Sequence, residues 1–214
     1  MRARYDENGK LLGFHNMVFD DIPDDYQMKT IFPNIDLPDL SFLGVMKYLR
    51  DIKAAKEFED NSAYSAEILS SLALDYLNSA LYLQRGIVEN RQVPSVSLYL
   101  IPCAYLCRHS VELKLKECLT EKKGSIAKTH SFSELWDALD EKTMPHFEAI
   151  NEFIRELAVL DENGMALRFG VSVKLEPLKE EFQFSIDALL DNTKFFFNVV
   201  DEHVICKYRY HSKG

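Results

Sequence analysis

The sequence predicts an all-α protein, with a helical bundle over residues 61–214 and an N-terminal arm over residues 1–60. Three observations predict this fold. Apolar residues recur at steps of three and four from Ser41 onward. Residues 100–118 are apolar on two sides of a helix, as a central helix must be. The one alternating run, residues 171–176, is too isolated to form a sheet and is expected to be a loop.

The N-terminal arm is expected to be irregular. Asn8-Gly9 lies between short apolar stretches and favours a small β-hairpin, because this pair accepts the positive φ values of a tight turn. Three prolines then prevent a continuous helix, at Pro23, Pro33 and Pro38. A first helix is expected from Ser41, within the arm.

The next two helices form the centre of the predicted bundle. One is expected from about Ser62 to Arg85, and either Gly86 marks its end or the helix extends a little further. The other is expected from about Ser95 to Glu121, and it either begins near Pro102 or bends there. Because this second helix is apolar on two sides, we expect it to be buried between neighbours.

Three more helices complete the prediction. Ser131 and Glu134 fit a capping box, in which each side chain bonds the other residue's backbone N–H at a helix start. The fifth helix begins near Pro145 and ends before Asn163-Gly164. A sixth begins near Pro177, where apolar residues repeat again at steps of four and three.

Composition and charge exclude several classes of protein. The net charge of −9 is unsuited to non-specific coating of nucleic acid. Residues 108–128 are richer in basic side chains, which is either a local basic face or a solvated helix face. There is no apolar run of membrane-spanning length, and the N-terminus lacks the apolar region of a signal peptide. Four scattered cysteines favour a reducing cytoplasm over a disulfide framework.

Sequence motifs for common chemistries are missing. The chain has no P-loop, no dinucleotide-binding glycine motif, no nucleophile elbow and no zinc-protease motif. It also lacks the Glu-x-x-His pairs of di-iron bundles. Cys103 and Cys107 lie one helical turn apart and are either zinc ligands or core residues. Since they lie on an apolar face, we expect core packing, and we predict no metal and no cofactor.

One group of polar residues stands out: Arg108, His109 and Glu112, together with His130 and Arg168. The first three share a helix face at spacings of three and four, so they can pair. A buried charge needs a partner, and such a cluster could be a structural network that fixes the central helix in register. It could equally bind an anion, form a proton-transfer pair at a dimer cleft, or form the dimer interface itself.

Three segments in order resemble a HEPN-type domain: YLCRHSVELKLKECL at Tyr105–Leu119, THSFSELWDAL at Thr129–Leu139 and ALRFG at Ala166–Gly170. The resemblance covers about residues 62–207. It implies an up-and-down bundle of four to five helices that dimerises through the helices carrying the polar cluster. Many members of this family are metal-independent endoribonucleases of defence and toxin–antitoxin systems, and others are non-catalytic.

Active members of the family resemble one another in an Arg that is followed by a His with four to six residues between them. No Arg of this sequence has a His at that distance, and Arg108 and His109 are adjacent. We therefore expect no catalytic residues. The resemblance implies a cytoplasmic homodimer of a prokaryotic defence or stress system, which binds a partner or an anionic ligand (a nucleotide or RNA) through the five residues of the polar group.

The alternative is a divergent metal-independent endoribonuclease. In that case Arg108 or Arg168 would steady the phosphate, and His109 or His130 would move the proton.

Overall fold

The computed structural model of the protein describes residues 2–5, 11–15, 61–89, 97–169 and 184–210. Several predicted features lie outside these residues. They are the proline-containing stretch 23–38, the helix from Ser41, the helix start at Ser95 and the alternating run 171–176. The chain divides into two units, Met1–Lys47 and Tyr48–Gly214, and each is described by itself.

The first unit contains a two-stranded antiparallel sheet. Strand β1 (Arg2–Tyr5) pairs with β2 (Leu11–His15), and Arg2 lies opposite His15. The register shifts between Arg4 and Tyr5. The pairing confirms the predicted hairpin, whose turn, residues 6–10, lies outside the described residues.

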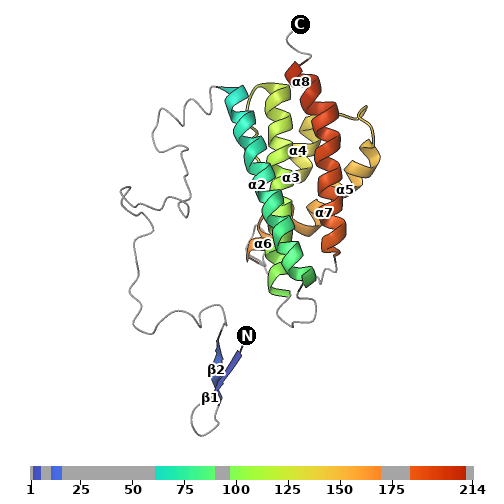
Figure 1. The fold of residues 1–214 in the computed structure, drawn as a ribbon. Coiled ribbons are helices and arrows are strands. Elements are labelled where there is room, and N and C mark those ends of the chain that lie inside the picture. Colours follow the sequence, from blue (N-terminus) through green and yellow to red (C-terminus); the bar gives the residue numbers. More distant parts are fainter. Residues whose placement is uncertain (1, 6–10, 16–60, 90–96, 170–183, 211–214) are drawn as a thin grey trace, which may run out of the picture. The chain divides into compact units, whose positions relative to one another are not determined.

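The described part of the second unit is helical, which confirms the predicted fold class. Its helices are α2 (Ser62–Glu89), α3 (Ser97–Lys123), α4 (Phe132–Leu139), α5 (Phe147–Asp161), α6 (Ala166–Phe169), α7 (Ile186–Val200), the π-helical turn η4 (Asp201–Ile205) and α8 (Cys206–Tyr210). Figure 1 shows α2, α3 and α7 running along one another. Helix α3 contacts α2, α4, α6, α7 and α8, and is therefore the central helix that its two apolar sides predict.

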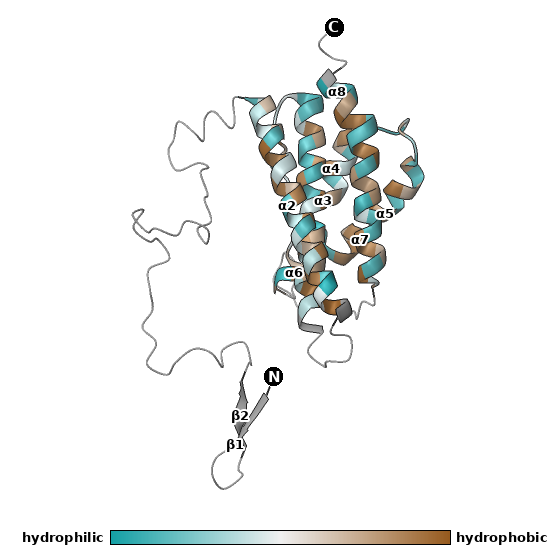
Figure 2. Ribbon diagram, in the orientation of Figure 1, coloured by the Kyte–Doolittle hydropathy of each residue, from teal (hydrophilic) through white to brown (hydrophobic). Residues whose placement is uncertain are grey.

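Small side chains bring α2 and α3 close together. The buried positions of α2 include Ala66, Ala73 and Ala80, at a spacing of seven residues that returns to the same helix face. They face an α3 surface that includes Cys103, whose thiol donates to the carbonyl oxygen of Ala80 at 3.2 Å. In Figure 2 these helices carry both hydrophobic and hydrophilic positions along their length, as expected for helices that each bury one side.

Three predicted helix boundaries can be compared with the structure. Helix α2 continues through Gly86 to Glu89, so of the two predicted ends the extension beyond Gly86 is the one that forms. Helix α3 contains Pro102 in its interior, so the helix does not begin there. The sixth predicted helix is not continuous, because residues 184–185 are not helical and α7 begins at Ile186; its expected start at Pro177 lies outside the described residues. The Ser185 hydroxyl caps the first turn of α7 by accepting from the Ala188 N–H at 3.2 Å.

The C-terminal helix changes its hydrogen-bond pattern in the middle. Between α7 and α8, the backbone N–H of Cys206 donates to the carbonyl oxygen of Asp201, five residues earlier, which makes η4 a π turn. Asp201 forms an ion pair with the buried Lys114 of α3. Among the described residues, no helix combines the length and apolar character that crossing a bilayer requires.

Glu141, in the turn after α4, connects this turn to α3 and α8. Its buried carboxylate lies 2.8 Å from the Nζ of Lys122 and 2.8 Å from the Nζ of Lys207, and it accepts a hydrogen bond from the Tyr208 hydroxyl. Burial alone would raise the pKa of Glu141. The hydrogen bonds from these three side chains outweigh burial and lower the pKa to about 2.

Replacing Glu141 with glutamine should therefore remove an acid-sensitive part of the stability. The native carboxylate stays charged down to about pH 2, whereas that of the unfolded chain takes up a proton near the ordinary value of 4.5. The stability difference between the original protein and Glu141→Gln should be complete above pH 4.5 and shrink as the pH falls towards 2. Urea midpoints across this range measure it. Glu148→Gln, an exposed change on α5, is the control, and a difference that does not vary with pH would contradict the assignment.

Candidate functional site

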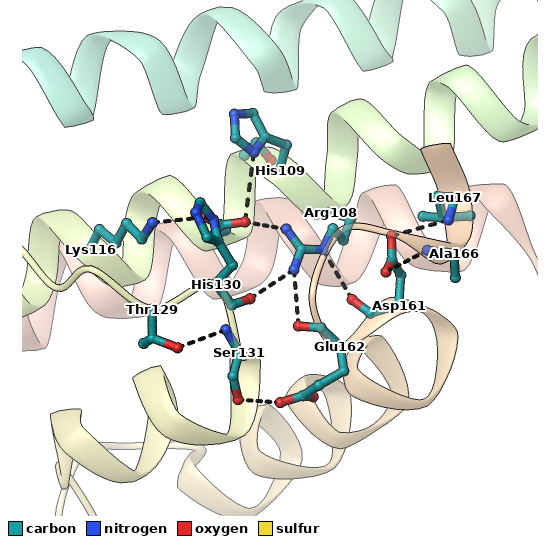
Figure 3. A network of polar contacts seen from close by, with 12 residues as sticks. Arg108, His109, Lys116, Thr129, His130, Ser131, Asp161, Glu162, Ala166 and Leu167 are labelled. Carbon is teal, nitrogen blue, oxygen red and sulfur yellow. Dashed lines mark hydrogen bonds and ion pairs between the residues drawn. The ribbon is translucent and has the colours of Figure 1, made fainter. Parts of the chain in front are cut away.

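The predicted polar group is centred on Arg108, whose side chain is only 1% exposed. Its Nε donates to the carbonyl oxygen of Asp161 at 3.1 Å, and its Nη2 donates to those of His130 and Glu162 at 3.0 Å each. Its Nη1 pairs with the carboxylate of Glu112 (Figure 3). All three guanidinium nitrogens therefore donate to acceptors within the protein.

Arg108 joins parts of the chain that are distant in sequence. The carbonyl oxygen of His130 belongs to the segment that leads into α4, and those of Asp161 and Glu162 lie at the end of α5. The guanidinium also lies 4.5 Å from the centroid of the Phe132 ring, at the start of α4. Arg108 thus fixes the start of α4 and the end of α5 against the central helix α3.

The carboxylate of Glu112 is the common partner of Arg108, Lys116 and the two histidines. Besides Arg108, it lies 2.9 Å from the Nζ of Lys116 and 2.7 Å from the Nδ1 of His130, and 3.7 Å separates its Oε2 from the Nδ1 of His109. Burial alone would raise the pKa of Glu112. The contacts with His109 and Lys116 and the positive charge of Arg108 outweigh burial and hold the pKa well below its usual range.

The ionised Glu112 fixes the orientation of His130. An ionised carboxylate can only accept hydrogen bonds, so the Nδ1 of His130 carries the hydrogen in this contact. The Nε2 is then the ring nitrogen that remains to accept a proton or a hydrogen bond. The His130 side chain is 63% exposed and that of His109 is 22% exposed, so the histidines are the part of this cluster that reaches solvent.

His109 also lies among aromatic rings. The edge of Tyr76 meets it at right angles with 4.5 Å between centroids, and Tyr105 stacks on it at 5.8 Å. Arg168 of α6 lies over Tyr105 at 5.8 Å and over Phe169 at 4.7 Å from the ring centroids. The five predicted residues are therefore arranged in two groups. Arg108, His109 and His130 surround the carboxylate of the fourth residue, Glu112. Arg168 is connected to His109 through Tyr105.

The sequence reasoning missed several members of this cluster. Lys116 lies four residues after Glu112, and that spacing was a sufficient signal for the pair. Asp161 and Glu162 contribute backbone carbonyl oxygens to Arg108, for which no side-chain pattern exists. The carboxylate of Asp161 accepts the N–H groups of Ala166 at 3.0 Å and Leu167 at 3.2 Å, and so holds the unpredicted helix α6.

The start of α4 confirms half of the predicted capping box. The Ser131 hydroxyl accepts from the Glu134 N–H at 3.1 Å, as expected. The prediction of the reciprocal bond, from the Ser131 N–H to the Glu134 carboxylate, is wrong. The Ser131 N–H donates to the Thr129 hydroxyl at 3.1 Å instead. The carboxylate of Glu162 accepts from the Ser131 hydroxyl and from the Ser133 N–H at 3.0 Å, so the end of α5 helps to cap α4.

Gly164 leaves room for the Arg108 guanidinium. Its φ is +74°, and a Cβ at this position would lie 3.3 Å from the Arg108 Nη1. Gly124 has nearly the same conformation, with φ of +71°, but a Cβ there would meet nothing within 4 Å. The two glycines therefore separate backbone strain from crowding of the guanidinium.

We expect Gly164→Ala to destabilise the protein more than Gly124→Ala. Both changes force a left-handed conformation on a residue with a Cβ, which costs about 1–2 kcal/mol. Gly164→Ala should cost roughly 1 kcal/mol more, because it also displaces the buried Arg108. Urea denaturation of the two variants measures this difference, and equal losses would show that the guanidinium can move at no cost.

The cysteines of α3 belong to the core. Cys103, Cys107 and Cys118 are fully buried, as the core-packing prediction requires. Burial raises the pKa of Cys103 to about 11 and that of Cys107 to about 12, so both remain thiols. Within the part of the chain that the structure describes, no three His, Cys, Asp or Glu residues are arranged to hold a metal ion.

Comparison with known proteins gives one match. Residues 99–189 match the model of the HEPN domain. The matched range contains Arg108, His109, Glu112, His130 and Arg168, and it agrees with the resemblance of the three sequence segments. No curated protein and no solved structure matches the chain.

Proposed function

From the HEPN match over residues 99–189, we propose that this domain binds an anionic ligand of the nucleotide or RNA class and does not cleave it. The proposed surface consists of His109, His130 and Arg168. The observation that carries the proposal is the direction of the Arg108 donors. Because this guanidinium is buried and all three nitrogens donate inward, it supports the site and does not touch the ligand.

The groups left at the surface suit an anion. Arg168 is exposed, and no carboxylate among the described residues pairs with it. His130 and His109 offer ring nitrogens around the Glu112 carboxylate, with their Nδ1 atoms on its side, and Tyr105 links His109 to Arg168. Glu112 is itself only 2% exposed, so its negative charge is kept from the ligand and is offset by Arg108 and Lys116.

The family supports the ligand class. HEPN domains are often linked to ribonuclease activity or nucleotide binding, and they often dimerise. The missing Arg-to-His spacing favours the non-catalytic branch. We extend the proposal to a homodimer that acts with a partner in a prokaryotic defence or stress system. Four free cysteines, three of them buried, are compatible with a cytoplasmic location.

One observation favours a second candidate, a divergent metal-independent endoribonuclease. His109 and His130 both direct Nδ1 towards the same carboxylate, as does a histidine that a carboxylate orients for proton transfer. Two such histidines could serve as base for the attacking 2′-hydroxyl and as acid for the leaving 5′-oxygen. Arg168, the exposed arginine that Tyr105 links to His109, would then steady the phosphate.

An incubation of the full chain with labelled single-stranded RNA in EDTA separates the two candidates. We expect binding, measured by fluorescence anisotropy, and RNA that stays intact on a gel. Arg168→Ala should weaken binding about tenfold, which corresponds to about 1.4 kcal/mol for one charged contact. Arg155→Ala, which removes an exposed arginine of α5, is the matched control.

Two outcomes would decide against the proposal. Cleavage in EDTA that disappears in both His109→Ala and His130→Ala would establish the second candidate in its place. No detectable binding at low salt would contradict the RNA-binding proposal, since phosphate contacts are strongest there.

A further inference from the structure

An exposed aromatic and cationic pair stands at the edge of the candidate site. Phe169 closes α6 and is 55% exposed. The guanidinium of its neighbour Arg168 lies 4.7 Å from the Phe169 ring centroid and 5.8 Å from that of Tyr105. Arg168 thus contacts two rings and keeps its charge without a carboxylate partner among the described residues.

The rings continue from this pair towards the buried carboxylate. Tyr105 stacks on His109 with an angle of only 8° between the ring planes, and Tyr76 meets the same histidine edge-on. A series of contacts therefore runs from the exposed Phe169 ring to His109, the residue next to Arg108. It passes through the Arg168 guanidinium and the Tyr105 ring. A site for phosphate alone would use the Arg168 guanidinium and the histidines, but the exposed ring of Phe169 would contribute nothing to it.

We propose that Phe169 and Arg168 form a stacking platform for a base of single-stranded RNA, an inference that rests on the proposed function. A ring and a guanidinium plane both stack on any nucleobase, whatever its sequence. The phosphate next to the stacked base would then lie on the side of His109, which Tyr105 links to this pair. The ligand is accordingly a strand with unpaired bases, and inorganic phosphate or a duplex backbone is recognised poorly.

The buried network positions this platform. The Asp161 carboxylate accepts the N–H groups of Ala166 and Leu167 at the start of α6, and its carbonyl oxygen accepts from Arg108 (Figure 3). Four residues cannot hold a helix by themselves, so these bonds fix the direction in which Arg168 and Phe169 extend. A platform that is fixed before the ligand arrives loses less conformational entropy on binding.

Abasic RNA tests the platform directly. We would compare a labelled single-stranded RNA with an oligomer of the same length and phosphate number in which the bases are absent. The unmodified protein should bind the base-bearing strand roughly fivefold to a hundredfold more tightly, the range that stacking of one base provides. Phe169→Ala should lose this preference and bind the abasic strand as the unmodified protein does.

Two further variants serve as controls. Phe195→Ala removes a ring of α7 that is 44% exposed, and it should keep the preference for bases. Phe169→Tyr keeps a ring and should also keep it. Thermal unfolding followed by circular dichroism should show all three variants folded, since both positions are exposed.

The failures are distinguishable. Equal affinity of the unmodified protein for the two strands would overturn the stacking platform and leave the anion-binding proposal standing. Equal losses in Phe169→Ala and Phe195→Ala would also overturn the platform. A protein that binds neither strand would overturn the platform and the proposed function together.

Discussion

Replacing Arg108 with alanine is expected to lower the free energy of unfolding by about 3–5 kcal/mol, as in other cases where one partner of a buried ion pair is removed. The change leaves the carboxylate of Glu112, which is 2% exposed, without its closest cation. It also removes the Arg108 donor from the carbonyl oxygens of His130 and Asp161, and it leaves that of Glu162 with the Phe132 N–H. Because domains are stable by only about 5–15 kcal/mol, this loss should be evident in a urea titration.

Two comparisons identify the source of the loss. Arg155→Ala removes an exposed arginine of α5 and should change the stability by less than about 0.5 kcal/mol. The double variant Arg108→Ala/Glu112→Gln should lose less than the sum of the two single changes, because it no longer buries an unpaired charge. Additive losses would show that the pairing of Arg108 with Glu112 is not the main source of the lost free energy of unfolding.

Replacing Lys114 with methionine should have an effect of similar size, about 3–5 kcal/mol. Lys114 is buried, and its Nζ lies 2.7 Å from Glu117, pairs with Asp201 and lies 5.3 Å from the centroid of Phe197. Burial would lower the pKa of Lys114, but Glu117 and Asp201 outweigh it and raise the pKa, so the lysine is charged. Methionine fills a similar volume but leaves Glu117 with Arg209, 3.4 Å away, as its remaining cation.

The loss in Lys114→Met should depend on pH. Burial raises the pKa of Glu117 even in the presence of Lys114, and removal of the lysine raises it further. A native carboxyl whose pKa is above its unfolded value of 4.5 loses stability as the pH rises through the native pKa. The difference from the original protein should thus be largest at neutral pH and shrink towards pH 4.5. Urea midpoints measure it, with Lys123→Met, an exposed change on the same helix, as the control. A loss independent of pH would argue against an unpaired Glu117.

Patterns along the chain were sufficient to predict the central helix and its ionisable residues. Apolar residues on two sides of residues 100–118 indicated burial, and the spacing of Arg108 and Glu112 indicated a pair. Both residues are buried. The Ser131 cap was predictable because hydroxyl caps act over three residues. These features are local, and local geometry is what a sequence pattern records.

The rest depends on contacts between distant segments. Arg108 bonds backbone carbonyl oxygens 22, 53 and 54 residues away, and every residue type offers such an acceptor. The repeat that includes Ile186 continues backwards to Pro177, so periodicity alone does not show where α7 begins, and the Ser185 cap marks that start. The partner of Lys114, Asp201, belongs to a π turn, which has no comparable sequence pattern.

That π turn, η4, sets the direction in which the side chains of α8 point around the helix axis. A hydrogen bond across five residues in place of four accommodates about one extra residue, and one residue corresponds to a rotation of about 100°. Lys207 and Tyr208 lie beyond it, and both reach Glu141. Were residues 201–205 wound as an ordinary α-helix, this pair would point about a quarter-turn away from its acceptor. The π turn thus rotates α8 so that Lys207 and Tyr208 point towards Glu141, in the turn after α4.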